Sequence, residues 1–332
     1  MALETRHKTV LLTGAGGPAS AGMVTTLRKW GYRIIAVDMR RHASAFYLAD
    51  KAYVIPAGNA PEFLPALQEI CDKESVDAIV SVVDEELPHT LEMESRGIQV
   101  IQPRSEFVAL CLDKYRCMKE LRKIGINAPE TWLATEIPSD AGYPLFIKPR
   151  VGRGSRGIGK VNSPDELATF LATSSYPAEH LLAQEFLAGT EFTVSVVVWR
   201  DGEVQAVVPK EIISKIGVTK LAVTRQNQKI HDLCVNIQTH FRADGPFNVQ
   251  LSLDDGGEPS PFEINPRFST SITLTMAAGV DELGGILSQA LFGKKSHRFS
   301  AWEEGIVLVR HTTDQFLAEK EDLEITPPAV IR

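Results

Sequence analysis

Two alternating patterns of polarity run through the first hundred residues. Short, nearly continuous apolar runs are separated by amphipathic stretches such as 22–31 and 61–75. Continuous apolar runs are typical of parallel strands buried on both faces, and the amphipathic stretches between them are typical of the covering helices. The pattern therefore predicts an α/β domain with a doubly wound parallel sheet, whose strands lie at 9–14, 33–38, 52–56, 78–83 and 99–103.

A helical period follows from Ser105 onward. Apolar residues from Val108 to Leu121 recur on one face, and Gly125 is a typical residue for the end of a helix. We expect one connecting helix within 104–127.

The pattern becomes β-like after residue 128. Short apolar runs are joined by turn sequences such as Arg-Asp-Gly-Glu (200–203) and Asp-Asp-Gly-Gly-Glu (254–258), which are typical of hairpins. This part of the chain is expected to be α+β, with mixed or antiparallel sheets, a helical stretch at 272–293 and one late strand at 306–312.

Composition limits the class of protein. The 332 residues are 44% hydrophobic and carry a formal net charge of −7, which favours a soluble globular protein and argues against nucleic-acid or membrane partners. No apolar run is long enough to span a membrane, and residues 1–10 are too polar for a signal peptide. We therefore expect a cytoplasmic protein.

The four cysteines are scattered and lack metal-ligand spacing, which predicts reduced thiols in the core. Cys111 and Cys117 fall on the single expected helix. Six residues apart on one helix, their side chains should not meet.

A glycine-rich turn follows the first predicted strand. Gly14, Gly16 and Ala19 match the pattern G-x-G-x-x-A, and Asp38 ends the next apolar run. These features are those of a dinucleotide fingerprint, in which the acid binds a ribose. An NAD(P)-dependent oxidoreductase is therefore one hypothesis.

A second group of candidate functional residues lies at 247–267. Glu263 and Asn265 alternate on one strand and therefore share a face, and Gln250 can approach them from the preceding strand. Three oxygen donors with a single formal charge suit Mg²⁺ shared with a polyphosphate. Arg267, two residues further on, is placed to meet the γ-phosphate. A solvated hairpin face is the alternative interpretation.

A third cluster combines a lysine with a glycine-rich loop. Lys148 ends an apolar strand and precedes a loop that contains Gly154, Ser155 and Gly157. Glycines let backbone N–H groups surround phosphates, although the order differs from that of a Walker loop. A flexible basic loop is the alternative.

The segment 184–191 is a weaker candidate for the nucleotide base. Gln184, Glu185, Phe186 and Leu187 have the pattern of an edge strand, whose backbone groups can form hydrogen bonds with the edge of an adenine base. Glu191 can bind ribose hydroxyls. An exposed strand–turn–strand explains the same residues.

Taken together, these segments resemble the ATP-grasp superfamily, in particular the synthetase units of the carbamoyl-phosphate synthetase large subunit and single-unit carboxylate–amine ligases. The motifs are D-K-Y…G-I-N-A-P-E-T (113–131), F-I-K-P (146–149), E-F-L-A-G-T-E-F-T (185–193), N-V-Q (248–250) and F-E-I-N-P-R (262–267). The resemblance implies a Rossmann-like pre-ATP-grasp domain (1–103), a connecting helix (104–127), a lid subdomain (128–190), a large subdomain (191–310) and a tail (311–332).

The resemblance also implies roles for individual residues. Lys114 and Lys148 would contact ATP phosphates, Glu185 and Leu187 the adenine edge, and Glu191 the ribose. Gln184 occupies a position where many relatives have a glutamate. The residues implied to hold one or two Mg²⁺ (or Mn²⁺) and to carry catalysis are Gln250, Glu263, Asn265, Lys148 and Arg267.

The implied reaction is ADP-forming ligation. A substrate carboxylate becomes an acyl phosphate, which an amine then attacks, so that small-molecule acids and amines are the expected partners and a homodimer is plausible. One synthetase unit without a glutaminase speaks against carbamoyl phosphate as the product. A module that binds ATP without catalysis is a further alternative.

The substrate side is less specific. The resemblance implies that the segment 209–224, with Lys210, is a loop that faces the substrate, whereas lysines on a loop are usually just solvated. For Ser269 and Glu85 the alternative is that they cap helices. The substrate candidates are Gly16, Gly17, Glu85, Lys215, Lys220 and Ser269.

Overall fold

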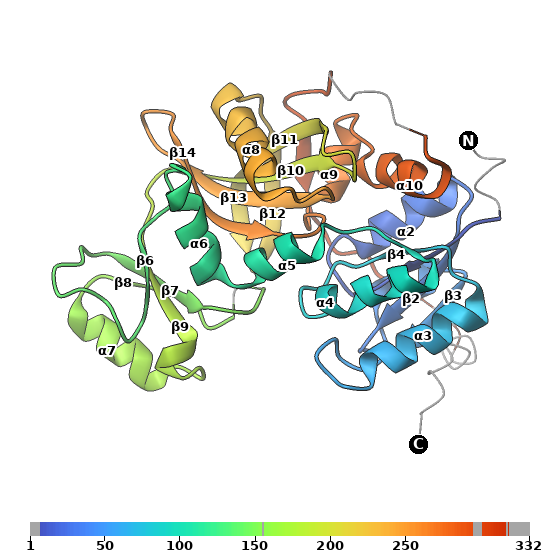
Figure 1. Cartoon of the computed structure of the whole chain (residues 1–332), viewed down its shortest axis with the longest axis horizontal. Coiled ribbons are helices and arrows are strands. Elements are labelled where there is room, and N and C mark those ends of the chain that lie inside the picture. Colours follow the sequence, from blue (N-terminus) through green and yellow to red (C-terminus); the bar gives the residue numbers. More distant parts are fainter. Residues whose placement is uncertain (1–6, 155, 295–300, 317, 319–332) are drawn as a thin grey trace.

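A computed structural model describes residues 7–154, 156–294, 301–316 and 318. Three sheets follow one another across the molecule: a parallel sheet in the N-terminal part, a large sheet in the middle and a small sheet at the far end (Figure 1). Among the described residues, no helix is long and apolar enough to cross a membrane.

The N-terminal sheet has the predicted parallel, doubly wound architecture. Its strand order is β3-β2-β1-β4-β5, and α2 packs on one face while α3 packs on the other. The elements are β1 (Thr9–Leu12), α2 (Ser20–Lys29), β2 (Arg33–Asp38), η1 (Ser44–Leu48), β3 (Lys51–Val54), α3 (Phe63–Glu74), β4 (Ala78–Val80), α4 (Leu87–Thr90), η2 (Leu91–Arg96) and β5 (Gln99–Val100).

The connecting segment is two helices rather than the single helix that the periodicity predicted. Helix α5 (Ser105–Leu112) stops at Asp113, which has extended backbone angles and caps α6 (Lys114–Lys123) by accepting a hydrogen bond from the Arg116 N–H at 3.2 Å. The break changes the helix direction, so that the thiols of Cys111 and Cys117 do meet, contrary to expectation.

The small sheet is antiparallel with the order β6-β9-β7-β8. It has its own apolar core, against which α7 packs, separate from the cores of the other two sheets. Its elements are β6 (Thr131–Leu133), β7 (Leu145–Pro149), β8 (Gly159–Val161), α7 (Pro164–Thr173), η3 (Ala178–His180) and β9 (Leu181–Glu185).

The central sheet is antiparallel, in the order β14-β13-β10-β11-β12-β15. Alternate residues such as Val194 and Val249 face an apolar core shared with α5, α6 and α8, which leaves the opposite face for polar groups. The elements are β10 (Thr190–Val198), β11 (Val204–Ile216), β12 (Val218–Thr224), α8 (Gln228–Phe241), β13 (Phe247–Leu253), β14 (Pro259–Asn265), α9 (Ile272–Ala277), α10 (Glu282–Phe292) and β15 (Val307–Val309).

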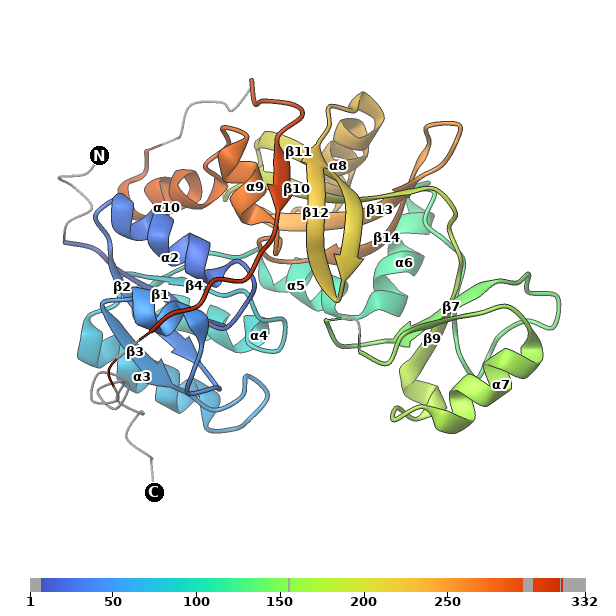
Figure 2. The ribbon, with the colours of Figure 1, turned by 180° about the vertical axis from the view of Figure 1, so that it is seen from behind.

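The N-terminal domain and the central sheet share one core. Leu12 and Met23 of the former belong to the same buried cluster as Val208 of β11 and Leu283 of α10. Figure 2 shows the segment after β15 passing over the N-terminal domain from the edge of the central sheet. The two parts are therefore packed as a unit.

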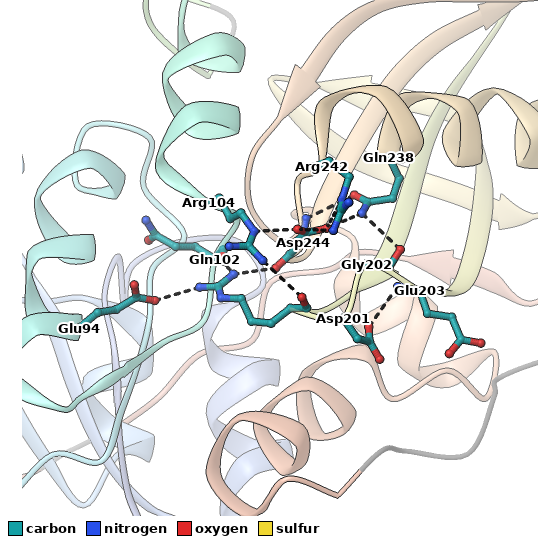
Figure 3. Close-up of polar contacts among 10 residues, drawn as sticks. Glu94, Gln102, Arg104, Asp201, Gly202, Glu203, Gln238, Arg242 and Asp244 are labelled. Atoms are coloured by element: carbon teal, nitrogen blue, oxygen red, sulfur yellow. Dashed lines mark hydrogen bonds and ion pairs between the residues drawn. The ribbon is translucent and has the colours of Figure 1, made fainter.

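A polar joint fixes the same two parts on another side (Figure 3). Asp244 is 1% exposed at its side chain and accepts a hydrogen bond from Arg104 Nε at 2.7 Å. Arg200 donates to the carbonyls of Gln102 and Asp244, at 3.0 and 2.6 Å, and to Glu94 at 2.9 Å. Because charged hydrogen bonds to buried groups are directional, this joint holds the N-terminal domain in one orientation over the central sheet.

Candidate nucleotide and metal site

The polar face of the central sheet carries the predicted metal donors. Gln250 lies directly opposite Glu263, and Asn248 lies opposite Asn265, so all four side chains share one face. Asn248 was not predicted from the sequence, although its spacing of two residues from Gln250 would have indicated it. The prediction that the hairpin brings Gln250, Glu263 and Asn265 together on one face agrees with this register.

The donor set fits a divalent cation that is completed by phosphate oxygens. Asn265 donates to Asn248 Oδ1 at 3.2 Å, and its own Oδ1 accepts from Arg267 Nη2 at 3.2 Å, which fixes the orientation of its amide. Among the described residues, the Glu263 carboxylate forms a single ion pair, with Lys114 Nζ at 3.8 Å, and accepts no hydrogen bond, so its oxygens are available to a ligand. No cluster of three or more His, Cys, Asp or Glu side chains occurs among the described residues, so a metal here would depend on one carboxylate, amides and phosphate.

Two lysines from different elements converge on the same strand. Lys148 of β7 donates to the Phe262 carbonyl at 2.9 Å, and Lys114 at the start of α6 lies beside Glu263. Lys148 is 4% exposed, and burial lowers its pKa to about 8, although the Glu263 carboxylate opposes the shift. A buried lysine without a partner carboxylate is suited to bind an anion.

Gln184 holds Lys148 in place. Its Oε1 accepts from Lys148 Nζ at 2.8 Å, and its amide nitrogen donates to Thr131 Oγ1 at 2.9 Å. Gln184 is buried at the middle of the small sheet, between β6 and β7. The neutral amide therefore positions the lysine without neutralising its charge.

The glycine-rich loop is tied to its surroundings at three points. Arg150 forms a two-point ion pair with Asp113, at 2.9 and 2.6 Å, and Lys114 Nζ donates to the Gly152 carbonyl. Arg153 Nε donates to Glu85 of the N-terminal domain at 2.6 Å. These contacts join the loop to the start of α6 and to the N-terminal domain, a result of tertiary structure that the local sequence did not predict.

The glycines of this loop adopt backbone angles that other residues rarely adopt. Gly154 and Gly157 have φ values of +73° and +63°, and a Cβ on Gly157 would lie 2.5 Å from the ring of Tyr176. Ser155 lies outside the described residues. The loop therefore requires glycine for its path, consistent with close backbone approach to a ligand.

The predicted adenine segment lies at the end of β9. The N–H groups of Glu185 and Phe186 donate to the carbonyls of Glu130 and Pro144, at 2.9 and 3.3 Å. Glu185 and Leu187 both line a pocket of about 180 Å³ between the small sheet and the β13–β14 hairpin. Their roles toward a base stay predictions.

Glu191 and Lys215 form an ion pair at 2.7 Å where β10 and β11 run beside each other. The segment 209–224 was expected to be a loop, but it forms most of two strands. β11 and β12 make a long hairpin that turns at Gly217. The side chains of this segment therefore follow strand alternation.

Arg267 is anchored in the N-terminal domain. Its Nε donates to Asp84 after β4, and both side chains are about nine-tenths buried. Burial by itself would lower the Arg267 pKa, but the carboxylates of Asp84, Glu263 and Glu85 together raise it. Asp84 is thus the partner of the predicted catalytic arginine, separated from it by 183 positions, which no local pattern could indicate.

Lys210 is fully buried on the polar face of the central sheet. Its ammonium group donates to Ser195, Ser269 and Thr275, at 2.7, 2.9 and 2.9 Å, and Ser195 in turn donates to Glu282 at 3.0 Å. Burial lowers the pKa of Lys210 and raises that of Glu282, while each charge partly offsets the shift of the other. The predicted substrate residue Ser269 is therefore engaged within the protein.

The glycine turn after β1 is a scaffold. Gly16 N–H donates to Asp38 Oδ2 at 2.7 Å, and Gly17 N–H donates to the Gly14 carbonyl at 2.8 Å. Asp38 is buried and also binds Arg40, so its carboxylate holds the turn rather than standing free for a ribose. Substrate contacts of Gly16 and Gly17 stay predictions, since both N–H groups have partners.

The buried carboxyl group of Glu86, beside this turn, is expected to make the free energy of unfolding depend on pH. It is 6% exposed and receives a hydrogen bond from Ser81 at 3.3 Å, and burial raises its pKa from 4.5 to about 7. Between these two values the folded state holds a proton that the unfolded state has lost, so stability falls as pH rises through that window.

We expect Glu86→Gln to remove this dependence and to raise the free energy of unfolding at pH 8 by about 3 kcal/mol. Denaturant titrations of both proteins at pH 4.5 and pH 8 measure it. Glu92→Gln, at an exposed position of η2, is the control and should change neither value. Equal pH dependence in the Glu86 variant and the original protein would contradict the prediction.

Two family models match the chain. One is described as "ATP-grasp in the biosynthetic pathway with Ter operon" and matches residues 177–314, and the other, "PylC-like, N-terminal domain", matches residues 10–101. The carbamoyl phosphate synthase large chain of Pyrococcus furiosus is 24% identical over 70% of this chain. The chain spans only 24% to 29% of the length of such curated relatives.

Solved structures share the fold. A biotin carboxylase from Campylobacter jejuni, solved as a β-γ-ATP complex, has a TM-score of 0.73 at 16% identity and covers 90% of this chain and 73% of its own. An L-amino acid ligase from Bacillus licheniformis has a TM-score of 0.68 at 17% identity, with 86% and 75% covered. The chain therefore has the ATP-grasp fold, in which residues 177–314 are similar to an ATP-grasp domain and residues 10–101 to a PylC-like N-terminal domain.

Proposed function

We propose that this protein is an ATP-dependent, ADP-forming carboxylate–amine ligase. The observation that carries the proposal is the convergence of Glu263, Lys114, Lys148 and Arg267 on the polar face of the central sheet, beside the amide donors Gln250 and Asn265. The fold supports it, since proteins named as an L-amino acid ligase and as biotin carboxylases have the same fold.

The lysines and the glycine-rich loop are proposed to bind the ATP phosphates. Lys148 lies between the small sheet and β14, so that its charge reaches a nucleotide held between the two. The ion pair of Arg150 with Asp113 positions the loop that would cover the phosphates and exclude water. Glu185 and Leu187 would bind the base, and Glu191 the ribose.

Glu263, Asn265 and Gln250 are proposed to hold Mg²⁺, with Mn²⁺ as a substitute. When bound, the cation neutralises charge on the transferred phosphoryl group. Asn248 keeps the Asn265 amide oriented, and Lys114 balances the Glu263 charge at 3.8 Å. These residues preorganise the site before the nucleotide arrives.

Arg267 is proposed to stabilise charge during phosphoryl transfer. An oxygen of the substrate carboxylate forms a bond to the γ-phosphorus while the bond to the bridging oxygen breaks, which gives an acyl phosphate and ADP. The amine nitrogen then bonds to the acyl carbon, phosphate leaves with the C–O electron pair, and the nitrogen loses its proton to phosphate or solvent. Asp84 keeps the arginine rigid throughout.

The remaining assignments belong to the same proposal. We place the domain boundaries at 1–103, 104–127, 128–190, 191–310 and 311–332, with the connecting segment as two helices. Four free, buried cysteines support a reducing compartment such as the cytoplasm. A homodimer stays a prediction from the sequence.

The test is a screen of acids and amines in pairs with the full chain, ATP and Mg²⁺. We expect at least one pair to release ADP and phosphate in equal amounts, together with an amide product detected by mass spectrometry. Release of AMP and pyrophosphate would contradict acyl-phosphate chemistry. ATP binding without turnover for any pair would favour the non-catalytic module, and tight binding of NADPH would favour the oxidoreductase.

A further inference from the structure

The polar face of the central sheet continues past the metal donors to its opposite edge. The register places Thr193 opposite both Gln250 and Lys210, and Lys210 opposite Thr224. On the last two strands, Lys220 of β12 lies opposite Arg310, whose N–H donates to the Lys220 carbonyl at 2.8 Å. Along β12, Thr224, Ala222 and Lys220 alternate onto the face of Lys210 and Gln250, although the pairing of β12 with β11 shifts its register beside Lys220. Arg310 lies across from Lys220, one position beyond the pair Leu221 and Val309.

The exposure of β15 agrees with this assignment. Val307 and Val309, on the outer face of this edge strand, are 53% and 67% exposed. Arg310 follows Val309 and therefore points to the inner face, where its Nη2 donates to the Thr270 carbonyl at 2.7 Å. Arg310 thus reaches the loop that begins at Asn265 and Arg267.

Most cations around this face have a carboxylate partner. Lys114 lies beside Glu263, Arg267 is paired with Asp84, Lys215 with Glu191, and Lys210 with Glu282 through Ser195. Lys220 and Arg310, in contrast, form no ion pair with any carboxylate among the residues that the structure describes. Two adjacent cations without counter-charge are suited to bind an anion.

Arg310 also has an unused donor. Within the described part of the chain, its Nη1 is buried and has no hydrogen-bond partner. A buried N–H without an acceptor is unfavourable, so an acceptor supplied by a ligand would stabilise the arrangement. Both Arg310 and Lys220 are only partly buried as whole residues, which leaves room for a small ligand to reach them.

We propose that Lys220 and Arg310 bind a carboxylate of a substrate, one that is not phosphorylated during the reaction. The inference rests on the proposed ligase function and specifies its substrate class. The phosphoryl-transfer end of the site lies at β14 with Arg267, whereas Lys220 and Arg310 lie at the other edge of the sheet, connected to it by the loop through Ser269 and Thr270. The anchored carboxylate therefore belongs either to an amino-acid nucleophile or to a dicarboxylic acid.

The binding test requires no turnover. We expect malonate to raise the thermal midpoint of the original protein above that in sodium chloride of equal ionic strength, and Arg310→Met and Lys220→Met to lose this shift. Arg225→Met is the matched control, because Arg225 pairs with Glu211, whose register places it on the opposite face, and should keep the shift. No malonate shift in the original protein, or an undiminished shift in both variants, would overturn the proposal.

Two variants are needed because Arg310→Met also removes the bond to Thr270. The Lys220 ammonium group has no hydrogen bond within the described residues, so Lys220→Met tests the charge without disturbing that loop. Arg310→Lys keeps the charge and should retain part of the shift. Loss of the shift in Arg310→Met alone, together with loss of native fluorescence, would indicate a structural role and would count against the site.

The kinetic test uses a substrate pair found by the ADP-release screen. We expect Arg310→Met to raise the KM of one substrate by about 10- to 100-fold, with the KM of ATP unchanged. Analogues in which a carboxylate of each substrate is replaced by a carboxamide then identify which substrate supplies the bound carboxylate. The original protein should reject one of these analogues, and Arg310→Met should no longer distinguish that analogue from the substrate.

Each outcome of the kinetic test is decisive. If Arg310→Met no longer rejects the carboxamide analogue of the amine substrate, the anchored carboxylate belongs to an amino-acid nucleophile. If it no longer rejects the carboxamide analogue of the acid substrate, the carboxylate belongs to a dicarboxylic acid. Unchanged discrimination in Arg310→Met would overturn the proposal. If no pair supports ADP release but malonate shifts the original protein and not the variants, the anion site stands and the ligase proposal fails.

Discussion

Glu263→Gln is expected to lower the ADP-forming turnover of this protein by about a thousandfold or more, while the fold is preserved. Glu263 carries the only formal negative charge among the proposed metal donors, and it lies directly opposite Gln250 on the adjacent strand. Glutamine has the same shape and keeps the strand register, but a neutral amide binds Mg²⁺ weakly and leaves the Lys114 charge without its neighbour at 3.8 Å.

The measurement is the initial rate of ADP release at saturating ATP and Mg²⁺, with circular dichroism and thermal unfolding to verify the fold. Glu211→Gln is the matched control, since Glu211 also lies in the central sheet but its register places it on the face opposite to the site, paired with Arg225 at 2.7 Å. We expect this control to retain nearly full activity. A Glu263→Gln protein as active as the control would refute the site assignment.

Lys210→Met is expected to lower the free energy of unfolding by about 3–5 kcal/mol. The substitution leaves Glu282, which is 1% exposed, without the cation that offsets its burial. It also removes the donor shared by Ser195, Ser269 and Thr275. An unpaired buried charge costs far more than a lost exposed ion pair.

Chemical denaturation of the full chain measures this effect. Lys229→Met, which breaks the exposed pair with Glu258, is the control and should cost less than about 1 kcal/mol. The double variant Lys210→Met/Glu282→Gln should recover part of the loss, because it restores neutrality. A Lys210→Met effect as small as that of the control would show that the buried pair does not support the fold.

Much of the architecture could be predicted from the sequence. The N-terminal strands were predicted because parallel, doubly covered strands are apolar on both faces and therefore form continuous runs, as at Thr9–Leu12 and Arg33–Asp38. Gln250, Glu263 and Asn265 were predicted to share a face because strand alternation and a short hairpin turn are local properties.

The local errors have identifiable causes. The helical periodicity continues across Asp113, but the Asp113 side chain caps a new helix and also binds Arg150 of the glycine-rich loop. In the first case the partner that decided the structure, Arg150, lies elsewhere in the chain. The segment with Lys210 was expected to be a loop because the relatives that the chain resembles have a substrate-facing loop there, although the alternation of its polar and apolar residues is typical of strands.

The sequence by itself determined the alternation of elements, the parallel N-terminal sheet and the residue types on the polar face of the central sheet, since these depend on local period and spacing. Only the tertiary structure decided that Arg267 is held by Asp84, Arg153 by Glu85 and Lys210 by the Glu282 network. The physical reason is that a buried charge is unfavourable unless a charged or hydrogen-bonding group lies beside it in the folded structure. Which groups lie side by side depends on how the sheets pack through their shared core, and not on neighbours along the chain.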